Sequence, residues 1–488
     1  MTSEPILPGF YPDPTICRVG EDYYLVNSSF EYFPGAPLWH SRDLVSWTQL
    51  GHVLDRRSQF DRGDGSPSAG LYAGTLRHHD GRFWYVTTNV GGSGGQLLVS
   101  THDPAGPWSE PVLIPAATGI DPDLAWDADG ACFLTWKAMS RAEGEIGILQ
   151  SRLDTQSGEL LDPPYPVWQG SGLSAAEGPH LYFIDGYWYL LLAEGGTERG
   201  HAVTIARGRH PRGPFEGCPV NPVLSHRSSI DPVQNTGHAD LVQTPAGDWA
   251  AVYLGVRTRG WTPGYHVLGR ETFLAGVQWR DGWPAFDVNH FQVPQVETGF
   301  MEDFAATELD HRWVVPGGDA DSVIQRDAES GILVRPPLPD GEPWTGLLCT
   351  RVRDLRWRAE ASIEGAGRFL VRVDHRHYYG LAHGAGFVEA IARIGDLDSV
   401  VARVSVPSGP VDLRIEAVDS SGWPVPSGNA GPDQIVLSLV QSGVAEELAR
   451  LDGRYLSTEV ASGFTGRVLA LGATAEPLRV RSLRYDPA

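Results

Sequence analysis

Cysteine is scarce in this chain, and the few cysteines are far apart. The 488 residues include four of them, Cys17, Cys132, Cys218 and Cys349, and no C-x-x-C pair occurs. A disulfide framework or a zinc site would need pairs or closer spacing. We therefore predict reduced, buried thiols and no metal site built on cysteine.

Basic charge is also in deficit. Lysine and arginine total 38 against 60 aspartate and glutamate residues, so the formal net charge is −22, spread along the chain. A surface this negative repels nucleic acids, anionic membranes and acidic polysaccharides. The composition therefore argues against nucleic acid and membranes as partners, and it favours a neutral or small substrate.

Long apolar runs and helical periodicity are absent. Residues 1–5 have neither a basic start nor the apolar segment of a signal peptide. No later run is long enough for a transmembrane helix, so we expect a soluble, cytoplasmic protein.

Glycine (58) and proline (37) are both abundant, which predicts an all-β fold of short strands joined by turns.

A repeated unit fills residues 1–295. In each copy a two-residue turn precedes an aromatic or β-branched strand, which is a hairpin signal. The turns are Gly20-Glu21, Asp80-Gly81, Asp129-Gly130, Asp185-Gly186 and Ala246-Gly247. Their spacing of roughly 50–60 residues suits four-stranded propeller blades. A generic β-sandwich with accidental turns is the alternative, but the ordered copies favour a five-bladed β-propeller over residues 1–295.

The rhythm of the sequence changes near Glu297. Beyond it, apolar and polar residues alternate, as in Phe369-Val371-Val373 and Leu413-Ile415-Ala417. Period-two alternation is typical of half-buried antiparallel strands. We therefore predict a second, C-terminal β-sandwich domain of jelly-roll, concanavalin-like type over residues 302–488.

Three acidic residues open predicted inner strands, and each is followed by a proline one or two residues later. They are Asp13 before Pro14, Asp121 before Pro122, and Glu177 before Gly178-Pro179. Proline fixes its own φ and restricts the residue before it, so these carboxylates lie on stiff backbone. Because a propeller gathers its inner strands around one axis, the three side chains can converge on one pocket.

Each of these acids also has a structural interpretation. Asp13 and Asp121 could cap turns, Asp123 is a competitor for the role of Asp121 that we expect to be solvated, and Glu177 could pair with an arginine. Glycoside hydrolysis, however, needs two carboxylates on opposite faces of a sugar ring, one as acid and one as base or nucleophile. A third acid nearby would keep the acid protonated by like-charge repulsion.

A series of short motifs runs through the chain in order. They read Phe10-Tyr11-Pro12-Asp13-Pro14-Thr15-Ile16, Ser29-Phe30-Glu31-Tyr32-Phe33-Pro34-Gly35, His40-Ser41-Arg42-Asp43-Leu44, Gly119-Ile120-Asp121-Pro122, Glu177-Gly178-Pro179-His180, Gly195-Gly196-Thr197, Gly237-His238-Ala239-Asp240 and Gly269-Arg270-Glu271-Thr272. As an ordered set they resemble the signatures of family 43 glycoside hydrolases. The resemblance covers essentially the whole chain and is closest to β-xylosidases and α-L-arabinofuranosidases with a C-terminal sandwich.

The resemblance implies a five-bladed propeller and inversion of configuration at the anomeric carbon. It implies that Asp13 is the general base that activates water and that Glu177 is the general acid that protonates the leaving oxygen. Asp121 would raise the pKa of Glu177 and orient it. Arg270 would lie against hydroxyls of the terminal sugar, and His238 would lie on the propeller axis near the pocket floor.

Three aromatic residues look like walls of the sugar site. Phe30 and Tyr72 match the non-reducing-end subsite, although an aromatic at the end of an inner strand is often core. Many relatives read Trp-Ala-Pro where this chain reads Tyr72-Ala73-Gly74, which leaves the sugar preference open. A sandwich loop with a phenylalanine reaches the active-site mouth in related enzymes. Gly463-Phe464-Thr465-Gly466 resembles that loop, although Arg467-Val468-Leu469 departs from the usual pattern.

No cofactor is expected to be required, and no metal ligand is predicted because no calcium-type loop is recognisable. In some family members the axial histidine lies beside a calcium ion, so the resemblance allows a structural calcium near His238. The expected partner is a small oligosaccharide, and a homo-oligomer is compatible with the sequence.

The function implied by the resemblance is an exo-hydrolase that releases β-D-xylose, α-L-arabinofuranose or both from non-reducing ends, as in xylan degradation. An α-L-arabinofuranosidase without xylosidase activity is one alternative, and a non-catalytic, carbohydrate-binding propeller is another. Retaining fructan- and sucrose-cleaving hydrolases share the architecture, but they carry Asn-Asp-Pro-Asn and Arg-Asp-Pro elements. This chain has Tyr11 before Pro12-Asp13 and Ile120 before Asp121.

Overall fold

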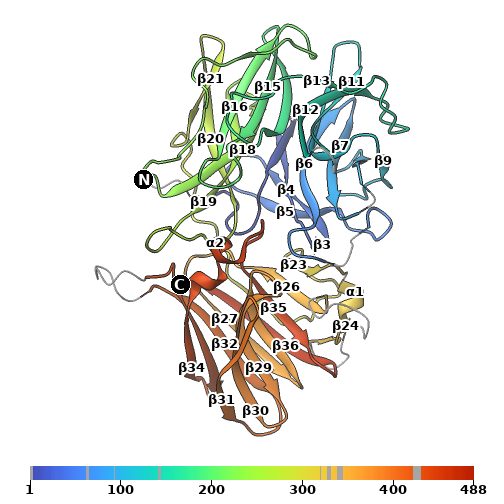
Figure 1. Cartoon of the computed structure of the whole chain (residues 1–488). Helices are drawn as coiled ribbons and strands as arrows, with labels where there is room; N and C mark the ends of the chain where they lie inside the picture. The colour runs from blue at the N-terminus through green and yellow to red at the C-terminus, as the bar shows by residue number, and fades with distance from the viewer. Residues whose placement is uncertain are drawn as a thin grey trace.

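The computed structural model describes residues 4–61, 65–92, 94–140, 144–318, 320–326, 331–337, 345–420 and 430–488. Two β-rich bodies are stacked one above the other, with the N-terminal half at the top of Figure 1. The described helices are short: α1 (Ala320–Val323), α2 (Thr458–Ala461) and the 3₁₀ turn η1 (Gly453–Leu456). None of the described helices is long and apolar enough to cross a membrane.

The upper body is a five-bladed β-propeller, which confirms the predicted fold class. Each blade is a four-stranded antiparallel sheet built from one continuous stretch of chain. The blades are β1 (Thr15–Val19), β2 (Asp22–Val26), β4 (Gly35–Ser41) and β5 (Thr48–Leu54); β6 (Gly70–His79), β7 (Arg82–Val90), β8 (Gln96–Thr101) and β9 (Val112–Ile114); β10 (Gly119–Trp126), β11 (Cys132–Ser140), β12 (Gly144–Leu153) and β13 (Tyr165–Pro166); β14 (Glu177–Ile184), β15 (Tyr187–Glu194), β16 (Ala202–Gly208) and β17 (Glu216–Gly217); and β18 (Val233–Gln243), β19 (Trp249–Arg257), β20 (Glu271–Arg280) and β21 (Trp283–Asp287).

The predicted hairpin turns join the first two strands of the blades. Asp80 and Gly81, between β6 and β7, have φ of 50° and 69°, and Asp185 and Gly186, between β14 and β15, have φ of 49° and 80°. Positive φ at both central residues is the geometry that Asp-Gly favours and that matches the twist of the flanking strands. The turn chemistry in the sequence was therefore a sound guide to the blade count.

A buried polar network ties the five blades together along the axis. Arg77 on β6 donates to Asp123 on β10 and to Asp240 on β18, each at 2.8 Å. The Thr15 hydroxyl of β1 donates to Asp240 at 2.8 Å, and His180 of β14 lies 3.2 Å from Asp123. One residue from each inner strand thus takes part, so the network joins all five inner strands.

The lower body is a β-sandwich of two eight-stranded sheets. One sheet contains β24 (Ile324–Arg326), β25 (Ile332–Val334), β36 (Leu478–Pro487), β27 (Trp357–Glu364), β32 (Val411–Val418), β33 (Gln434–Gln441) and β34 (Val444–Asp452), with β22 (Phe300–Glu302) paired to β36. The other contains β3 (Tyr32–Phe33), β23 (Trp313–Pro316), β26 (Leu347–Arg351), β35 (Val468–Ala473), β28 (Gly367–Arg372), β29 (His377–Gly384), β30 (Phe387–Ile394) and β31 (Leu397–Ser405). The alternating residues Phe369, Val371, Leu413 and Ile415 face the core between the sheets.

The two bodies share a sheet. β3 belongs to the propeller segment, yet it pairs with β23 of the sandwich, with Phe33 opposite Val315 and Tyr32 opposite Pro316. The last propeller strand ends at Asp287 and the first sandwich strand begins at Phe300. The predicted boundaries at residues 295 and 302 stay predictions, but the sandwich is joined to the propeller by backbone hydrogen bonding as well as by the linker.

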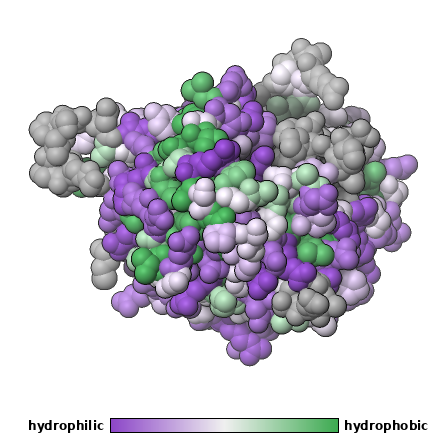
Figure 2. Space-filling model, turned by 90° about the horizontal axis from the view of Figure 1, so that it is seen from below, coloured by the Kyte–Doolittle hydropathy of each residue, from purple (hydrophilic) through white to green (hydrophobic). Residues whose placement is uncertain are grey.

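The far end of the sandwich exposes apolar side chains. Seen from below, this face carries an apolar patch bordered by hydrophilic residues (Figure 2). Exposed apolar residues of the sandwich include Met301, Leu397, Val400, Val401 and Val444. Leu397, Val400 and Val401 belong to β31, and Val444 opens β34, so these residues lie on the edge strands of the two sheets.

Candidate active site

Four inner strands are interrupted by β-bulges, and half of the eight predicted site residues lie at these interruptions: Tyr72, Asp121, Glu177 and His238. The pairing register shifts between Leu71 and Gly74 in β6, Ile120 and Asp123 in β10, Glu177 and His180 in β14, and Gly237 and Asp240 in β18. Pro122 and Pro179 account for two of the shifts, because proline has no N–H to pair in a sheet. A bulge re-aims side chains, and here the re-aimed side chains face the axis.

The backbone at the site is also unusual. Asp13, Asp121 and His238 have φ of 51°, 55° and 47°. Left-handed backbone is uncommon for residues other than glycine and costs energy, and such residues cluster at functional sites. The surrounding sheets hold these three side chains in orientations that a regular strand would not give.

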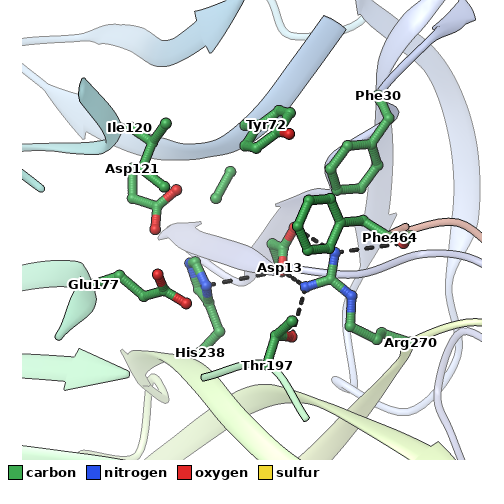
Figure 3. A pocket seen from close by; sticks show the side chains of 11 residues that line it. Asp13, Phe30, Tyr72, Ile120, Asp121, Glu177, Thr197, His238, Arg270 and Phe464 are labelled. Carbon is green, nitrogen blue, oxygen red and sulfur yellow. Dashed lines mark hydrogen bonds and ion pairs between the residues drawn. The ribbon is translucent and has the colours of Figure 1, made fainter. Parts of the chain in front are cut away.

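All eight predicted site residues line one pocket of about 70 Å³. It is lined by Asp13, Phe30, Tyr72, Ala73, Ile120, Asp121, Glu177, Thr197, His238, Arg270 and Phe464. Figure 3 shows the carboxyl groups of Asp13, Asp121 and Glu177 around a common space, with the aromatic rings on one side. The structure thus brings together residues from every blade and from the sandwich, while their individual roles stay predictions.

Asp13 is buried and held as a carboxylate. Arg270 Nη1 donates to its Oδ1 at 2.9 Å, and the Ser28 hydroxyl donates to its Oδ2 at 2.7 Å. Burial alone would raise the pKa of Asp13, but the Arg270 guanidinium, His238 and the Ser28 hydrogen bond together hold it below its ordinary value. A carboxylate that stays ionised at neutral pH can accept a proton from water.

Asp121 has the opposite electrostatics. Burial and the neighbouring carboxylates of Glu177 and Asp13 raise the pKa of Asp121 well above its usual range. The hydrogen bond that it accepts from the Gly178 N–H, at 3.1 Å, only partly offsets these causes. Asp121 therefore retains a proton more readily than an isolated aspartic acid would.

Glu177 projects from the start of β14 and is paired with a lysine. Lys137 Nζ on β11 lies 2.9 Å from Glu177 Oε2, and only 4% of the lysine side chain is exposed. The suggested arginine partner of Glu177 was thus the wrong residue, since the observed ion pair is with Lys137. Nothing in the motifs pointed to this lysine.

Arg270 and His238 complete the polar side of the pocket. Besides Asp13, Arg270 Nη1 donates to the Thr197 hydroxyl at 3.0 Å, and Thr197 lies in the Gly195-Gly196-Thr197 motif. His238 Nδ1 lies 3.8 Å from Asp13 Oδ1. Burial lowers the pKa of His238 to about 4, so the imidazole is neutral at neutral pH.

Three aromatic rings form one wall. Phe30 stacks on Phe464 with ring centroids 5.6 Å apart, and Tyr72 contacts Phe30 edge-on at 5.1 Å. The Phe464 N–H donates to the Ser68 hydroxyl at 2.9 Å, which pins the sandwich loop onto the propeller. The sandwich therefore contributes a wall of the pocket, as the resemblance implied.

Asp123 is not a solvated rival of Asp121. Its side chain is fully buried, and it accepts hydrogen bonds from Arg77 at 2.8 Å and from the Leu181 N–H at 2.9 Å. The expectation of solvation was wrong because Asp123 lies two residues further along β10, below the bulge, where it joins the axial network.

The described residues do not form a protein cage for a metal. A calcium ion takes about six to eight oxygen ligands. Among the residues that the structure describes, no group of three or more His, Cys, Asp or Glu side chains could hold a metal ion. Asp13, beside His238, is already paired with Arg270. The calcium near His238 stays a prediction, and no chemical step is assigned to a metal.

A larger cavity adjoins the pocket. It encloses about 660 Å³ and shares Thr197, Arg270 and Phe464 with the pocket. The α2 region contributes Thr458 and Glu459, and Glu459 bonds to His266 of the propeller. This cavity offers room for the part of a ligand that the small pocket cannot hold.

The pocket on the propeller axis holds two adjacent acids and, opposite them, an ionised carboxylate. These are the groups that hydrolysis of a glycosidic bond requires, so the site is typical of a glycoside hydrolase. The model for glycosyl hydrolases family 43 matches residues 2–284. The chain belongs to this family.

Named relatives support the assignment over different lengths. The chain is 47% identical over 294 residues to a xylosidase/arabinosidase of Butyrivibrio fibrisolvens, an alignment that covers 58% of this chain and 56% of that protein. It is 34% identical over 497 residues to a non-reducing end α-L-arabinofuranosidase of Bacteroides ovatus, covering 96% of this chain and 90% of that protein. A solved xylan β-1,4-xylosidase from Bacillus halodurans superposes with a TM-score of 0.88 at 28% identity, covering 100% of both chains.

Proposed function

We propose that the protein is an inverting exo-glycoside hydrolase that releases a terminal pentose, β-D-xylose or α-L-arabinofuranose, from the non-reducing end of oligosaccharides. The observation that carries the proposal is a pocket of about 70 Å³ that is lined by three carboxyl groups and three aromatic rings. Its small volume leaves no room for a second sugar residue, and its acids suit cleavage of the bond at C1.

In this proposal Asp13 accepts a proton from the attacking water while the water oxygen bonds to C1. Glu177 gives its proton to the glycosidic oxygen, and the C1–O bond breaks with that electron pair leaving on the oxygen. Water attacks from the face opposite the leaving group, so configuration inverts. The two carboxyl groups should then stand roughly 6.5–9.5 Å apart, because a water must fit between Asp13 and the sugar.

Arg270 and the aromatic wall would hold the sugar in place. Arg270 fixes Asp13 and has Thr197 beside it, so it can also meet a sugar hydroxyl. Phe30, Tyr72 and Phe464 offer apolar faces for the ring. The adjoining cavity of about 660 Å³ would receive the leaving group. Such an arrangement admits a chain end and releases one sugar at a time.

Between the two pentoses we favour xylose only slightly. The relatives carry both names, since one is a xylosidase/arabinosidase and another an α-L-arabinofuranosidase. Tyr72 stands on the wall that would discriminate the two sugars, and its hydroxyl donates to the Ser68 carbonyl at 2.9 Å. An α-L-arabinofuranosidase without xylosidase activity is the narrower alternative.

A panel of aryl glycosides tests the proposal: the β-D-xyloside, the α-L-arabinofuranoside and the β-D-galactoside, with kcat/KM for each. We expect activity on one or both pentosides and far less on the galactoside. Glu177→Ala should abolish cleavage of xylobiose. Sugar binding without hydrolysis of any of these substrates would identify a carbohydrate-binding propeller instead.

We also propose a cytoplasmic location and self-association, each on one observation. Cys17, Cys132, Cys218 and Cys349 are all free and buried, which suits a reducing compartment. Exposed apolar residues on the edge strands β31 and β34 offer a surface for a second copy. Light scattering of the purified enzyme would give its mass in solution and so test self-association. We expect that activity needs no cofactor.

A further inference from the structure

Lys137 is the only lysine of the chain. Of the 38 lysine and arginine residues, all except Lys137 are arginines. The single exception is buried, with 4% of its side chain exposed, and it lies against Glu177. A position that carries lysine in a chain otherwise built with arginine calls for a physical explanation.

The position of Lys137 links two blades at the pocket. Lys137 lies on β11, opposite Ile120 of β10, and Ile120 lines the pocket. Its Nζ reaches across to β14 of the next blade, where it meets Glu177 Oε2 at 2.9 Å. Figure 3 shows the Glu177 carboxyl directed toward the space between Asp121 and His238. The Lys137 ammonium thus engages the Oε2 atom of the Glu177 carboxyl group.

The charges around Glu177 have different signs on different sides. Asp121 on β10 and Asp13 before β1 are acids. Burial, Glu177 and Asp13 raise the pKa of Asp121, and Lys137 opposes that shift. His238 on β18 is neutral because burial lowers its pKa to about 4. Arg270, before β20, is paired with Asp13. Lys137 therefore supplies a positive charge directly at Glu177, where the acids supply negative charge.

A lysine and an arginine would act differently here. A guanidinium presents a planar fork that binds both oxygens of a carboxylate, whereas an ammonium is a point donor. A fork on Glu177 would engage both oxygens. The ammonium of Lys137 can hold Oε2 and leave Oε1 for a substrate. Lysine thus combines a fixed orientation of the carboxyl group with an accessible oxygen.

We propose that Lys137 is a positioning residue that orients Glu177 and stabilises the carboxylate that forms when Glu177 gives up its proton. This inference rests on the proposed function of Glu177 as general acid. Asp121 favours the protonated acid before the reaction, and Lys137 favours the ionised acid after proton transfer. The two neighbours act in opposite directions on one carboxyl group.

The first test compares pH profiles. Lys137→Met removes the charge at nearly constant volume, so the acid should hold its proton to higher pH. We expect the alkaline limb of kcat/KM to move up by about one pH unit or more. We expect a larger loss of kcat on xylobiose than on an aryl xyloside with an acidic leaving group. Lys137→Arg should return the alkaline limb of the kcat/KM profile to its wild-type pH, but it should not restore the full kcat.

The matched control is a second ion pair in the blade that carries Lys137. Arg152 on β12 lies 2.8 Å from Asp162, with 42% of its side chain exposed. Arg152→Met should leave the pH profile unchanged. If Lys137→Met folds, keeps its alkaline limb in place and loses xylobiose and aryl xyloside activity equally, Lys137 is a structural residue and the proposal is overturned.

The second test does not need turnover. Labelling with ¹³C-lysine gives one side-chain Cε signal, because the chain holds one lysine. In the wild type this signal should shift in a step as the neighbouring acid ionises, and Glu177→Gln should remove the step. A signal that is the same in both proteins at every pH would contradict the proposal. Failure of the function itself would appear separately, as a wild type inactive on every glycoside.

Discussion

Buried acidic residues lie at two levels along the propeller axis, and the environments of Asp121 and Asp123 differ most. At the pocket level are Asp121 and, before β1, Asp13, while Asp123 and Asp240 lie deeper. Asp121 and Asp123 are two residues apart on one strand and both are buried. Asp123 is bonded to Arg77, whereas the pKa of Asp121 is raised by burial and by two other carboxylates. Pairing with a cation, and not burial, separates Asp123 from Asp121.

The difference shows how one scaffold serves two purposes. At the deeper level Arg77 donates to two carboxylates and ties blades together, which makes these acids structural. At the pocket level Asp13 is paired with Arg270 and Glu177 with Lys137, while Asp121 lies beside both acids and retains a proton more readily. Perturbed acids of this kind mark functional sites, and the bulges between the levels allow both on the same strand.

The largest expected effect is that of Asp13→Asn. It removes the carboxylate that Arg270 and Ser28 hold, and general-base assistance supplies about 10²–10⁴ in rate. We expect a folded protein with near-zero turnover of every substrate. Asp22→Asn, at a half-buried pair with His40 on the outside of the first blade, is the control that should stay active. More than about a tenth of wild-type activity in Asp13→Asn would refute the base assignment.

Arg77→Met should destabilise the deeper level, where Arg77 pairs with Asp123 and Asp240. Removing one partner of a buried ion pair costs about 3–5 kcal/mol, because Asp123 and Asp240 would be left without their cation. We expect a large fall in the free energy of unfolding, measured by urea denaturation. The neighbouring Arg82→Met, over the Trp84 ring at the surface, should change little. An unaltered stability in Arg77→Met would show that the network is not what joins the blades.

Glu177→Gln should show a dependence on the leaving group. A general acid matters most when the leaving oxygen is a poor leaving group, so xylobiose cleavage should nearly stop. Substrates with acidic aryl leaving groups need less protonation and should lose far less of their kcat. Equal losses on both kinds of substrate would assign Glu177 to the deeper, structural class of acids.

The last two substitutions, Asp121→Asn and Asp240→Asn, should change Tm in opposite directions. The pKa of Asp121 is raised in the folded state, so its contribution to stability is present below its ordinary value of 3.8 and is lost as pH rises through the raised pKa. Asp121→Asn should therefore raise Tm modestly in alkaline buffer. It should also move the alkaline limb of kcat/KM to lower pH, because a like charge leaves the side of Glu177.

Asp240 behaves in the reverse way. Despite its burial, its pKa is lowered by Arg77, His180 and its hydrogen bonds, so its contribution to stability is present above 3.8 and is lost as pH falls through the lowered pKa. Asp240→Asn should lower Tm at neutral pH. In strong acid the Tm of the variant should approach that of the wild type. If both substitutions changed Tm in the same direction, the division into two levels would fail.

The sequence predicted the propeller and the three acids for identifiable reasons. A glycine-containing turn repeats once per blade, and the prolines after Asp13, Asp121 and Glu177 mark backbone that cannot continue a regular strand. The sequence did not predict that Asp123 would be buried, because its partner Arg77 lies in another blade. Lys137 was missed for the same reason, although its status as the only lysine was visible in the sequence.

The sandwich was predicted as a fold but not as a part of the propeller's sheet system. Alternation revealed its strands, since period two is a local signal. The pairing of Tyr32 and Phe33 with β23 joins segments far apart in the sequence, and no local pattern announces it. Phe464 could be placed only through the resemblance of its loop.

The most direct test of the account is the configuration of the first product. The enzyme is mixed with a β-linked xylo-oligosaccharide, and the anomeric signals are followed by proton NMR before mutarotation. An inverting enzyme with a one-sugar pocket should release α-xylose first, with monosaccharide alone accumulating early. Initial β-xylose would contradict inversion by Asp13 and Glu177, and an early ladder of shorter oligosaccharides would contradict the pocket.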